Sequence, residues 1–572
     1  MSDDFEPTVK ALARKYALEN ALKHGKANPG AVIGKVMAEG GDAVRPRAKD
    51  VPALANAVIA EVNAMSPEAM KEAFAAFEGT LVQRAKVERE GPLKPLPNAV
   101  KGKVVLRLAP NPSGPPHFGH GRGMIITSEY KRMYDGQFIL RFDDTDTTVK
   151  PPWMPAYQMF PETVAWLCQA PPDRIIYASD HMEQYVDWAL ELIRRGGAYV
   201  CECVGDTFRE LKEKATACPH REQPADLNEA KFKTMVDGGY RRGAAVLRVK
   251  TDIAHKDPAM RDWVAFRIAE EPHPRLALAG KPQYSAWPLL DFQSAIDDHL
   301  EGVTHIIRGK DLRDSTAKQE FLYAHLGWTY PETMYWGRVS VHEFGKFSKS
   351  ILNKAIEAGE YTGWDDPRLP TFPALRRRGF TPEGIRNFWL SFGITEKDIA
   401  ASIVTLEAEN KKILEPIAHR YFFVADPKPV TIEGSGPLHA TPALLPDEPK
   451  AGVRDIIVHD GKILLAAEDA KDGPLRLKDL GNIHLRTKRA SYEGNDLAWA
   501  RANKAPIVHW VPAAGAVRVT LVTPDNERVE GMAEPMLARE KVGAPVQLER
   551  VGFARVDEKR ADGSLVLYFT HK

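Results

Sequence analysis

The feature that most limits the fold of this chain is a short apolar run, a turn rich in proline and glycine, and a helical stretch in direct succession. Residues 103–108 read Lys-Val-Val-Leu-Arg-Leu, which is typical of a strand buried in a parallel sheet. The turn ends in His117-Phe118-Gly119-His120, and helical spacing continues to about residue 134. A helix that begins at such a turn presents unpaired backbone N–H groups, which attract anions.

Two histidines three residues apart can both point at an anion bound there, and Gly119 leaves room for a flat base beside the backbone. The alternative is an ordinary turn that carries two surface histidines. Because a strand and a Pro-Gly turn precede it, the motif favours a nucleotide site in which His117 and His120 contact phosphate.

The rest of the chain divides by its periodicity into three regions. Residues 1–88 space their apolar side chains by three and four, which predicts a small helical bundle used for packing or docking. Strand-like and helical runs alternate over about 101–345, which predicts a parallel α/β sheet. From about residue 428 short β runs between turn residues predict β-barrels.

Composition narrows the function classes. The 572 residues suffice for several domains, and 78 basic against 77 acidic side chains leave a net charge of +1. This balance excludes a globally basic surface but leaves room for a local basic groove. No apolar run reaches the roughly 20 residues that cross a bilayer, and the acidic N-terminus has no apolar signal region. We therefore expect a cytoplasmic protein that makes no membrane contact.

A second basic segment, Lys346-Phe347-Ser348-Lys349-Ser350, follows Gly345. Two lysines among small hydroxyl residues form a loop whose point charges hold phosphates. By itself such a segment is more often a solvated loop. Together with the histidine pair it predicts an ATP site to which Gly119, Lys346, Ser348 and Lys349 contribute.

With both motifs in place, the chain resembles the class I aminoacyl-tRNA synthetases, whose HIGH and KMSKS motifs bind ATP. It looks most like the glutamyl-tRNA synthetases of the archaeal and eukaryotic type. Glutaminyl-tRNA synthetases share the C-terminal architecture but usually carry a Pro-Glu-Pro-Asn-Gly type phrase that this chain lacks. The resemblance spans nearly the whole chain and is carried by residues 28–36 (NPGAVIGKV), 109–114 (APNPSG), 141–146 (RFDDTD), 297–305 (DDHLEGVTH), 307–310 (IRGK) and 363–371 (GWDDPRLPT).

The resemblance implies a reaction in two steps. Glutamate attacks the α-phosphate of ATP, accompanied by Mg²⁺, and gives glutamyl-adenylate and pyrophosphate; the glutamyl group then passes to the 3′ end of tRNA(Glu). His117 and His120 would stabilise charge on the phosphates, and Lys349, with Lys346, would hold the leaving pyrophosphate. Whether tRNA(Gln) is also charged stays open.

Selection of glutamate requires a cation for its side-chain carboxylate, and Arg107 at the end of the predicted strand fits that role. The alternative for Arg107 is an ordinary salt bridge. The resemblance places Asp143 at the α-ammonium group and Arg308 at the α-carboxylate, with Ala109 and Asn111 lining the same pocket.

The chain departs from the family pattern at three positions. Related enzymes carry polar or aromatic pocket residues where this chain has Leu290, so the contacts that separate glutamate from glutamine stay open. Phe118 and Phe347 replace the usual second residue of each ATP motif. Both changes keep an apolar side chain, and we expect them to be tolerated.

Three of the four cysteines and a histidine lie close together in the sequence, as Cys201-Glu202-Cys203 and Cys218-Pro219-His220. Three thiolates and one imidazole complete a tetrahedral structural Zn²⁺ site. The alternative is a set of buried thiols without a metal. A comparable zinc module in the acceptor-binding insertion of some glutamyl-tRNA synthetases favours the metal.

Contacts with RNA are predicted at Arg376, Arg377 and Arg378, which form a basic patch with Lys411, Lys412 and Arg420 unless they are only a solvated helix face. We expect a monomer whose N-terminal domain binds a protein partner. The predicted order is an N-terminal helical domain (1–90), the first half of a Rossmann-like catalytic domain (91–200), an acceptor-binding insertion with the zinc module (201–290), the second catalytic half with the KMSKS-like loop (291–360), a helical connecting region that contacts the tRNA stem (361–425) and a β-barrel anticodon-binding region (426–572).

Two rival classes remain besides a glutaminyl-tRNA synthetase. A nucleotidylyltransferase of the same superfamily shares the H-x-G-H motif, but it needs no long region after Lys349. A non-catalytic tRNA-binding or scaffold protein would have no use for His117, His120 and Lys349, all of which are present.

Overall fold

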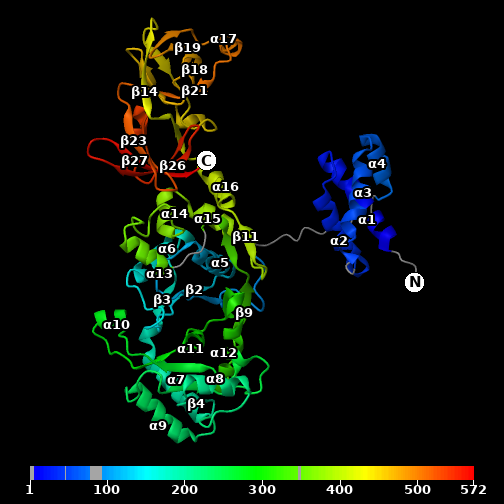
Figure 1. The fold of residues 1–572 in the computed structure, drawn as a ribbon, viewed down its shortest axis with the longest axis vertical. Coiled ribbons are helices and arrows are strands. Elements are labelled where there is room, and N and C mark those ends of the chain that lie inside the picture. Colours follow the sequence, from blue (N-terminus) through cyan, green and yellow to red (C-terminus); the bar gives the residue numbers. More distant parts are fainter. Residues whose placement is uncertain (1–4, 45–46, 78–92, 345–348) are drawn as a thin grey trace. The chain divides into compact units, whose positions relative to one another are not determined.

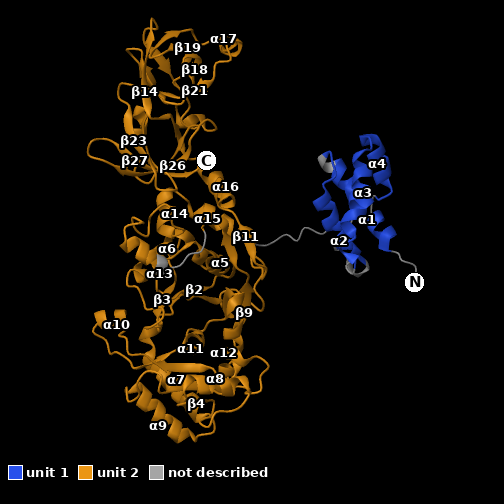
Figure 2. Cartoon of the chain, viewed as in Figure 1, with its two compact units in different colours: residues 1–88 blue, residues 89–572 orange. Residues whose placement is uncertain are grey.

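The computed structural model of the chain describes residues 5–44, 47–77, 93–344 and 349–572. Its contacts divide the chain into two compact units, residues 1–88 and residues 89–572 (Figure 2). Among the described helices, none combines the length and the apolar character needed to cross a membrane.

Unit 1 is helical in its described part, as its periodicity predicts. Ser66 caps the last helix by accepting a hydrogen bond from the Ala69 N–H, and Pro67 occupies the first turn. Valines and alanines fill the core, in which Lys15 is 5 % exposed and pairs with Glu39. The helices are α1 (Phe5–His24), α2 (Pro29–Val44), α3 (Val51–Asn63) and α4 (Pro67–Ala75).

The centre of unit 2 is a parallel five-stranded sheet in the order β3-β2-β1-β8-β9, which confirms the predicted α/β class. Because β8 returns beside β1, the strand order reverses between these two strands, where α/β sheets bind ligands. The strands are β1 (Val105–Leu108), β2 (Gln137–Phe142), β3 (Arg174–Tyr177), β8 (His305–Gly309) and β9 (Glu332–Trp336), and the helices of this layer are α5 (Phe118–Tyr134), α6 (Ala156–Cys168), α7 (Met182–Arg194), α11 (Leu290–Leu300) and α12 (Arg313–Leu326).

An antiparallel four-stranded sheet is inserted between β3 and β8, in the order β4-β5-β6-β7. Its core is continuous with that of α7, α11 and α12, so the insertion is fixed to the catalytic layer by packing. Figure 1 shows it on the side of the parallel sheet opposite the C-terminal strands. Its elements are β4 (Ala198–Cys201), α8 (Gly205–Glu213), α9 (Ala225–Val236), β5 (Val246–Val249), β6 (Val264–Ile268), α10 (Pro274–Leu278) and β7 (Ala286–Pro288).

A mainly helical segment links the parallel sheet to the C-terminal region. Thr371, Thr381 and Ser402 each cap a helix by accepting a backbone N–H, and this fixes where the helices begin. The segment comprises β10 (Val339–Val341), α13 (Lys349–Glu357), α14 (Phe372–Arg378), α15 (Pro382–Phe392), β11 (Ile399–Ala401) and α16 (Ile403–Leu414).

The C-terminal region holds two seven-stranded sheets, in the orders β12-β25-β26-β27-β23-β24-β13 and β21-β18-β19-β20-β14-β17-β22. In each sheet the two edge strands are consecutive in the chain and separated by one residue, Phe422 or His509. Each sheet therefore curves back on itself as a nearly closed barrel around its own apolar core, which confirms the predicted β-barrel class. The elements are β12 (His419–Tyr421), β13 (Phe423–Ala425), β14 (Pro427–Glu433), β15 (Leu438–Ala440), β16 (Ile456–Val458), β17 (Lys462–Ala466), β18 (Gly473–Leu477), β19 (Gly481–Arg486), β20 (Arg489–Tyr492), α17 (Leu497–Ala502), β21 (Ile507–Val508), β22 (Trp510–Pro512), β23 (Val517–Val522), β24 (Arg528–Ala533), β25 (Pro545–Leu548), β26 (Gly552–Lys559) and β27 (Leu565–His571).

The predicted basic patch on α14 is wrong for one of its three arginines. Arg376 is exposed, but Arg378 is 5 % exposed and donates Nη2 to the Thr570 carbonyl at 3.0 Å. Burial lowers the pKa of Arg378 to about 10. Since successive residues of a helix point about 100° apart, Arg376 and Arg378 lie on nearly opposite sides of α14, and the side that carries Arg378 is the buried one. Arg378 therefore fastens α14 to β27 and is not available to RNA.

Candidate active site

The two predicted histidines lie together at the start of α5. The N-cap residue is His117, whose Nδ1 accepts the Gly119 N–H at 3.2 Å, and His120 Nδ1 accepts the His117 N–H at 3.1 Å. The ring centroids are 3.9 Å apart. Because Nδ1 accepts a hydrogen bond in both rings, each neutral imidazole carries its proton on Nε2 and can donate it outward.

Both imidazoles are poor bases here. Burial lowers the pKa of His117 to about 4, and burial with the neighbouring His117 holds the pKa of His120 well below its ordinary value. The pair therefore offers neutral hydrogen-bond donors to a phosphate group rather than positive charges.

Aromatic packing fixes this helix start and places Phe344 beside it. Phe118, 4 % exposed, lies 4.9 Å from the Trp389 ring and 5.3 Å from the Phe344 ring, centroid to centroid. The Phe118 N–H also donates to the Pro370 carbonyl at 2.8 Å. Phe344 lies two positions before Lys346, so the apolar substitution at position 118 contacts the chain just before the KMSKS-like segment.

The second motif lies partly outside the described residues. Lys346 and Ser348 lie outside the described residues. Lys349 is the first residue of α13, and its side chain also lies outside the described part of the chain. Their contacts with phosphate therefore stay predictions.

A cavity of about 210 Å³ opens where the strand order reverses between β1 and β8. Four of the five predicted glutamate-binding residues line it, namely Arg107, Ala109, Asp143 and Arg308. Asn111 is not in the wall; its Nδ2 donates to the Asp143 carbonyl at 3.2 Å. A larger cavity of about 480 Å³, between α6, α14 and β26, contains none of the residues predicted for ATP, glutamate or metal; Arg376 and Arg377, two of the arginines predicted to contact RNA, are in its wall.

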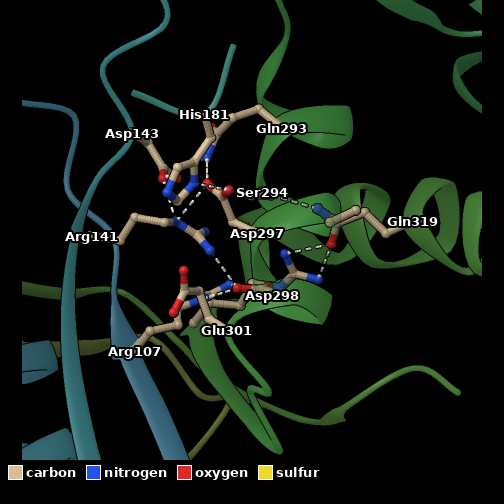
Figure 3. Close-up of polar contacts among 12 residues, drawn as sticks. Arg107, Arg141, Asp143, His181, Gln293, Ser294, Asp297, Asp298, Glu301 and Gln319 are labelled. Carbon is tan, nitrogen blue, oxygen red and sulfur yellow. Dashed lines mark hydrogen bonds and ion pairs between the residues drawn. The ribbon is translucent and has the colours of Figure 1, made fainter. Parts of the chain in front are cut away.

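Most charged side chains around the smaller cavity form ion pairs with one another (Figure 3). Arg107 donates Nε and Nη2 to the two oxygens of Asp298 at 3.1 and 3.2 Å, so the salt bridge considered as an alternative is present. By contrast, Arg308 pairs with none of the described acidic residues; it donates to Gln319 and to the Tyr330 hydroxyl at 2.8 Å. Arg308 therefore keeps its charge for an anion in the cavity.

Several residues of this cluster have no predicted role. Arg141 bridges Asp143 and Asp298, and Gln293 Nε2 donates to Asp143 at 3.0 Å and to Asp297 at 2.7 Å. Arg141 and the Asp297-Asp298 pair lie in two of the segments that carry the family resemblance, 141–146 and 297–305. The residues next to them in the sequence gave no indication of which side chains they contact. Among the described residues, four buried polar atoms here have no hydrogen-bond partner, which is typical of a ligand site: Asn111 Oδ1, Arg141 Nη2, Gln293 Oε1 and Arg308 Nε.

The predicted metal ligands also come together. The donor atoms of Cys201, Cys203, Cys218 and His220 all lie within 4.8 Å of one another. The Cys201 and Cys218 sulfurs are 3.9 Å apart, close to the edge of about 3.8 Å of a tetrahedron with Zn–S bonds of about 2.3 Å. His220 turns Nδ1 toward the Cys203 sulfur at 3.3 Å and Nε2 toward Glu202 at 3.7 Å, as metal-bound histidines do. The donor set and geometry fit a tetrahedral ion.

Comparison with known families now identifies the class. Residues 103–416 match the family model described as tRNA synthetases class I (E and Q), catalytic domain. Residues 418–500 and 507–557 match the two models described as the anti-codon binding domain of the same group. The chain therefore belongs to the class I tRNA synthetases of the E and Q group.

Three similar curated proteins are glutamate–tRNA ligases. The glutamate–tRNA ligase of Methanocella arvoryzae is 45 % identical over 98 % of this chain and 99 % of its own length. That of Methanothrix thermoacetophila is 47 % identical over 99 % of both chains, and that of Pyrococcus furiosus is 44 % identical over 99 % of this chain and its full length. A solved glutamate tRNA ligase from Elizabethkingia meningosepticum aligns with 55 % of this chain and 70 % of its own, at 18 % identity and a TM-score of 0.39.

Proposed function

We propose that this chain is a glutamate–tRNA ligase, which activates L-glutamate with ATP and transfers it to the 3′ end of tRNA(Glu). The observation that carries the proposal is the cavity between β1 and β8, where Arg107, Asp143 and Arg308 meet. Two cations and one carboxylate match the two carboxylates and one ammonium group of glutamate. The relatives named above support the same substrate.

Within this proposal the chain positions the reactants and neutralises charge; no covalent intermediate with the protein forms. Arg308 would hold the α-carboxylate, Asp143 the α-ammonium group and Arg107 the side-chain carboxylate. Held in this way, the α-carboxylate oxygen attacks the α-phosphate of ATP. Nε2–H donors of His117 and His120 would bind the phosphates as charge shifts to the leaving pyrophosphate.

The remaining charge on the triphosphate needs cations. Lys346 and Lys349, with Ser348 beside them, are proposed for the pyrophosphate, and Mg²⁺ would accompany the ATP and neutralise its phosphate oxygens. The contact between Phe118 and Phe344 supports this role, because it sets the entry of the lysine segment next to the histidine pair.

The other parts of the chain fit a tRNA partner. The two C-terminal barrels would bind the anticodon, in agreement with the family models that match them. The cysteine cluster would hold a structural Zn²⁺ that fixes the inserted sheet against the tRNA acceptor end. The same proposal includes a monomeric state, a cytoplasmic location and a protein partner for the N-terminal helices. It also includes the domain order predicted from the sequence.

Pyrophosphate exchange, with one component omitted at a time, tests the function. Exchange should need glutamate, ATP and tRNA together, since this family generally requires tRNA for activation. Exchange with glutamine would favour a glutaminyl-tRNA synthetase. Nucleotide transfer without tRNA would favour a nucleotidylyltransferase, and either result would overturn the proposal.

A further inference from the structure

Two charged residues beside the glutamate pocket have no part in the chemistry above: Arg141 at the end of β2 and Asp298 on α11. Both side chains are 1 % exposed. Arg141 donates Nη1 to Asp298 Oδ1 at 2.7 Å and Nε to Asp143 Oδ1 at 2.8 Å. One buried guanidinium therefore holds a residue of the cavity wall and the carboxylate that pairs with Arg107 (Figure 3).

The pairing with Asp298 determines how Arg107 faces the cavity. Asp298 takes the edge of the guanidinium formed by Nε and Nη2, and this two-point contact fixes the plane of the group. Among the described residues, Nη1 of Arg107 has no hydrogen-bond partner, while Arg107 lines the cavity. The Nη1 edge is thus left for a carboxylate that enters the pocket.

Asp298 cannot neutralise Arg107 alone, because Arg141 competes for it. Asp298 Oδ1 accepts from Arg141 Nη1 and from Arg107 Nε at once. Burial by itself would raise the pKa of Asp298, and the two arginines overcome that effect and hold it below its ordinary value. The carboxylate therefore stays ionised and its charge is divided between two guanidinium groups.

Position 290 gives the pocket wall no polar group that could separate glutamate from glutamine. Leu290 lines the cavity and carries no polar group. A carboxamide has the size of a carboxylate, so apolar contact cannot separate them, whereas the residual charge on Arg107 can.

We propose that Arg141 and Asp298 are positioning residues that set the preference for glutamate over glutamine, given the proposed function. Asp298 aims Nη1 of Arg107 into the cavity, and Arg141 draws off part of the Asp298 charge so that Arg107 stays attractive to a carboxylate. Neither residue touches the substrate.

The test compares two conservative variants, Asp298→Asn and Arg141→Lys, in tRNA-dependent pyrophosphate exchange with glutamate and with glutamine. Each should raise the KM for glutamate on the order of tenfold and lower the glutamate-to-glutamine ratio of kcat/KM on the order of tenfold or more. In Asp298→Asn the cause is lost orientation, because an amide oxygen replaces only one of the two acceptors that hold Arg107; in Arg141→Lys it is lost charge, because Asp298 then neutralises Arg107 more fully. The KM for ATP should stay within about twofold, because the histidine pair is not in contact with the cluster.

A matched control separates selection from stability. Glu549→Gln changes a buried acid to its amide in the same way, since Glu549 pairs with the buried Arg454 at 2.7 Å in the C-terminal region. It should lower stability but leave the glutamate-to-glutamine ratio unchanged. If Asp298→Asn does not fold, as judged by circular dichroism, Arg141→Lys carries the test.

A folded variant whose ratio stays within about twofold of the unmodified protein would overturn the inference, as would an equal rise in the KM for ATP. The proposed function fails separately: it is lost if the unmodified protein does not activate glutamate, whatever the variants do.

Discussion

The histidine pair should bind ATP in its neutral form, so catalysis should not weaken as the pH rises through the ordinary imidazole range. The reason is that Nδ1 of His117 and Nδ1 of His120 each accept a hydrogen bond from a backbone N–H group. Each ring then has one proton, on Nε2, and that proton is the donor to phosphate. A mechanism that relies on imidazolium charge predicts the opposite pH dependence.

The size of the effect follows from the pKa of His117, which burial lowers to about 4. At pH 7 about one molecule in a thousand then has a protonated His117, and protonating it costs about 4 kcal/mol. This free energy exceeds the worth of an additional charge–phosphate hydrogen bond, which is about 1.5–3 kcal/mol. Binding of the phosphate by the neutral imidazole is therefore favoured in free energy over binding by the imidazolium.

The assay is kcat/KM for ATP from about pH 6 to about pH 8, with excess Mg²⁺ and saturating glutamate and tRNA, because this parameter reports the free enzyme. We expect no decline across this range. A need for imidazolium would make kcat/KM fall about tenfold per pH unit above its pKa. Such a fall, abolished by His117→Asn, would refute the reasoning; ionisation of ATP itself gives a rise with pH instead.

Three further predictions concern the metal cluster and the packing. Cys218→Ser should abolish a zinc content of about one ion per chain, measured by plasma mass spectrometry, whereas Cys168→Ser, in the core away from the cluster, should retain it; zinc-free unmodified protein would contradict this. Gly121→Ala should lower the free energy of unfolding by about 1–3 kcal/mol in urea, despite the helix propensity of alanine, because the new Cβ would lie 2.7 Å from Phe372 Cζ and 2.9 Å from Trp389 Nε1; a more stable variant would show that the helix start is loosely packed. Arg454→Met should cost about 3–5 kcal/mol, because it leaves Glu534 buried without its cation and Glu549 with Lys478 as its remaining partner; an unchanged unfolding midpoint would contradict the importance of this ion cluster.

Local features were predictable from the sequence. The strand, turn and helix over 103–134 have strong short-range signals, and the structure places β1 and α5 there. The cysteine cluster was equally accessible, because its ligands lie within twenty positions of one another in the chain and the metal chemistry restricts the residue types. Neither prediction required contacts between residues that are far apart in the sequence.

Long-range contacts were not predictable from periodicity. Arg107 meets Asp298 only because β1 lies beside β8 and α11 leads into β8, and no local pattern encodes that register. The inserted sheet was missed as an antiparallel unit for a related reason: its strands have three to five residues, too few for alternation to be distinct. Arg378 was misassigned because composition does not show which side of a helix faces the core.

The proposed function requires that this cavity selects glutamate and that the chain transfers it to tRNA(Glu). The most direct measurement incubates the protein with ATP, Mg²⁺, total tRNA and a mixture of the standard amino acids, then identifies the aminoacyl-adenosine by mass spectrometry and the tRNA by sequencing. We expect glutamyl-adenosine on tRNA(Glu). Glutaminyl-adenosine, any other aminoacyl-adenosine, or no acylated tRNA at all would contradict it.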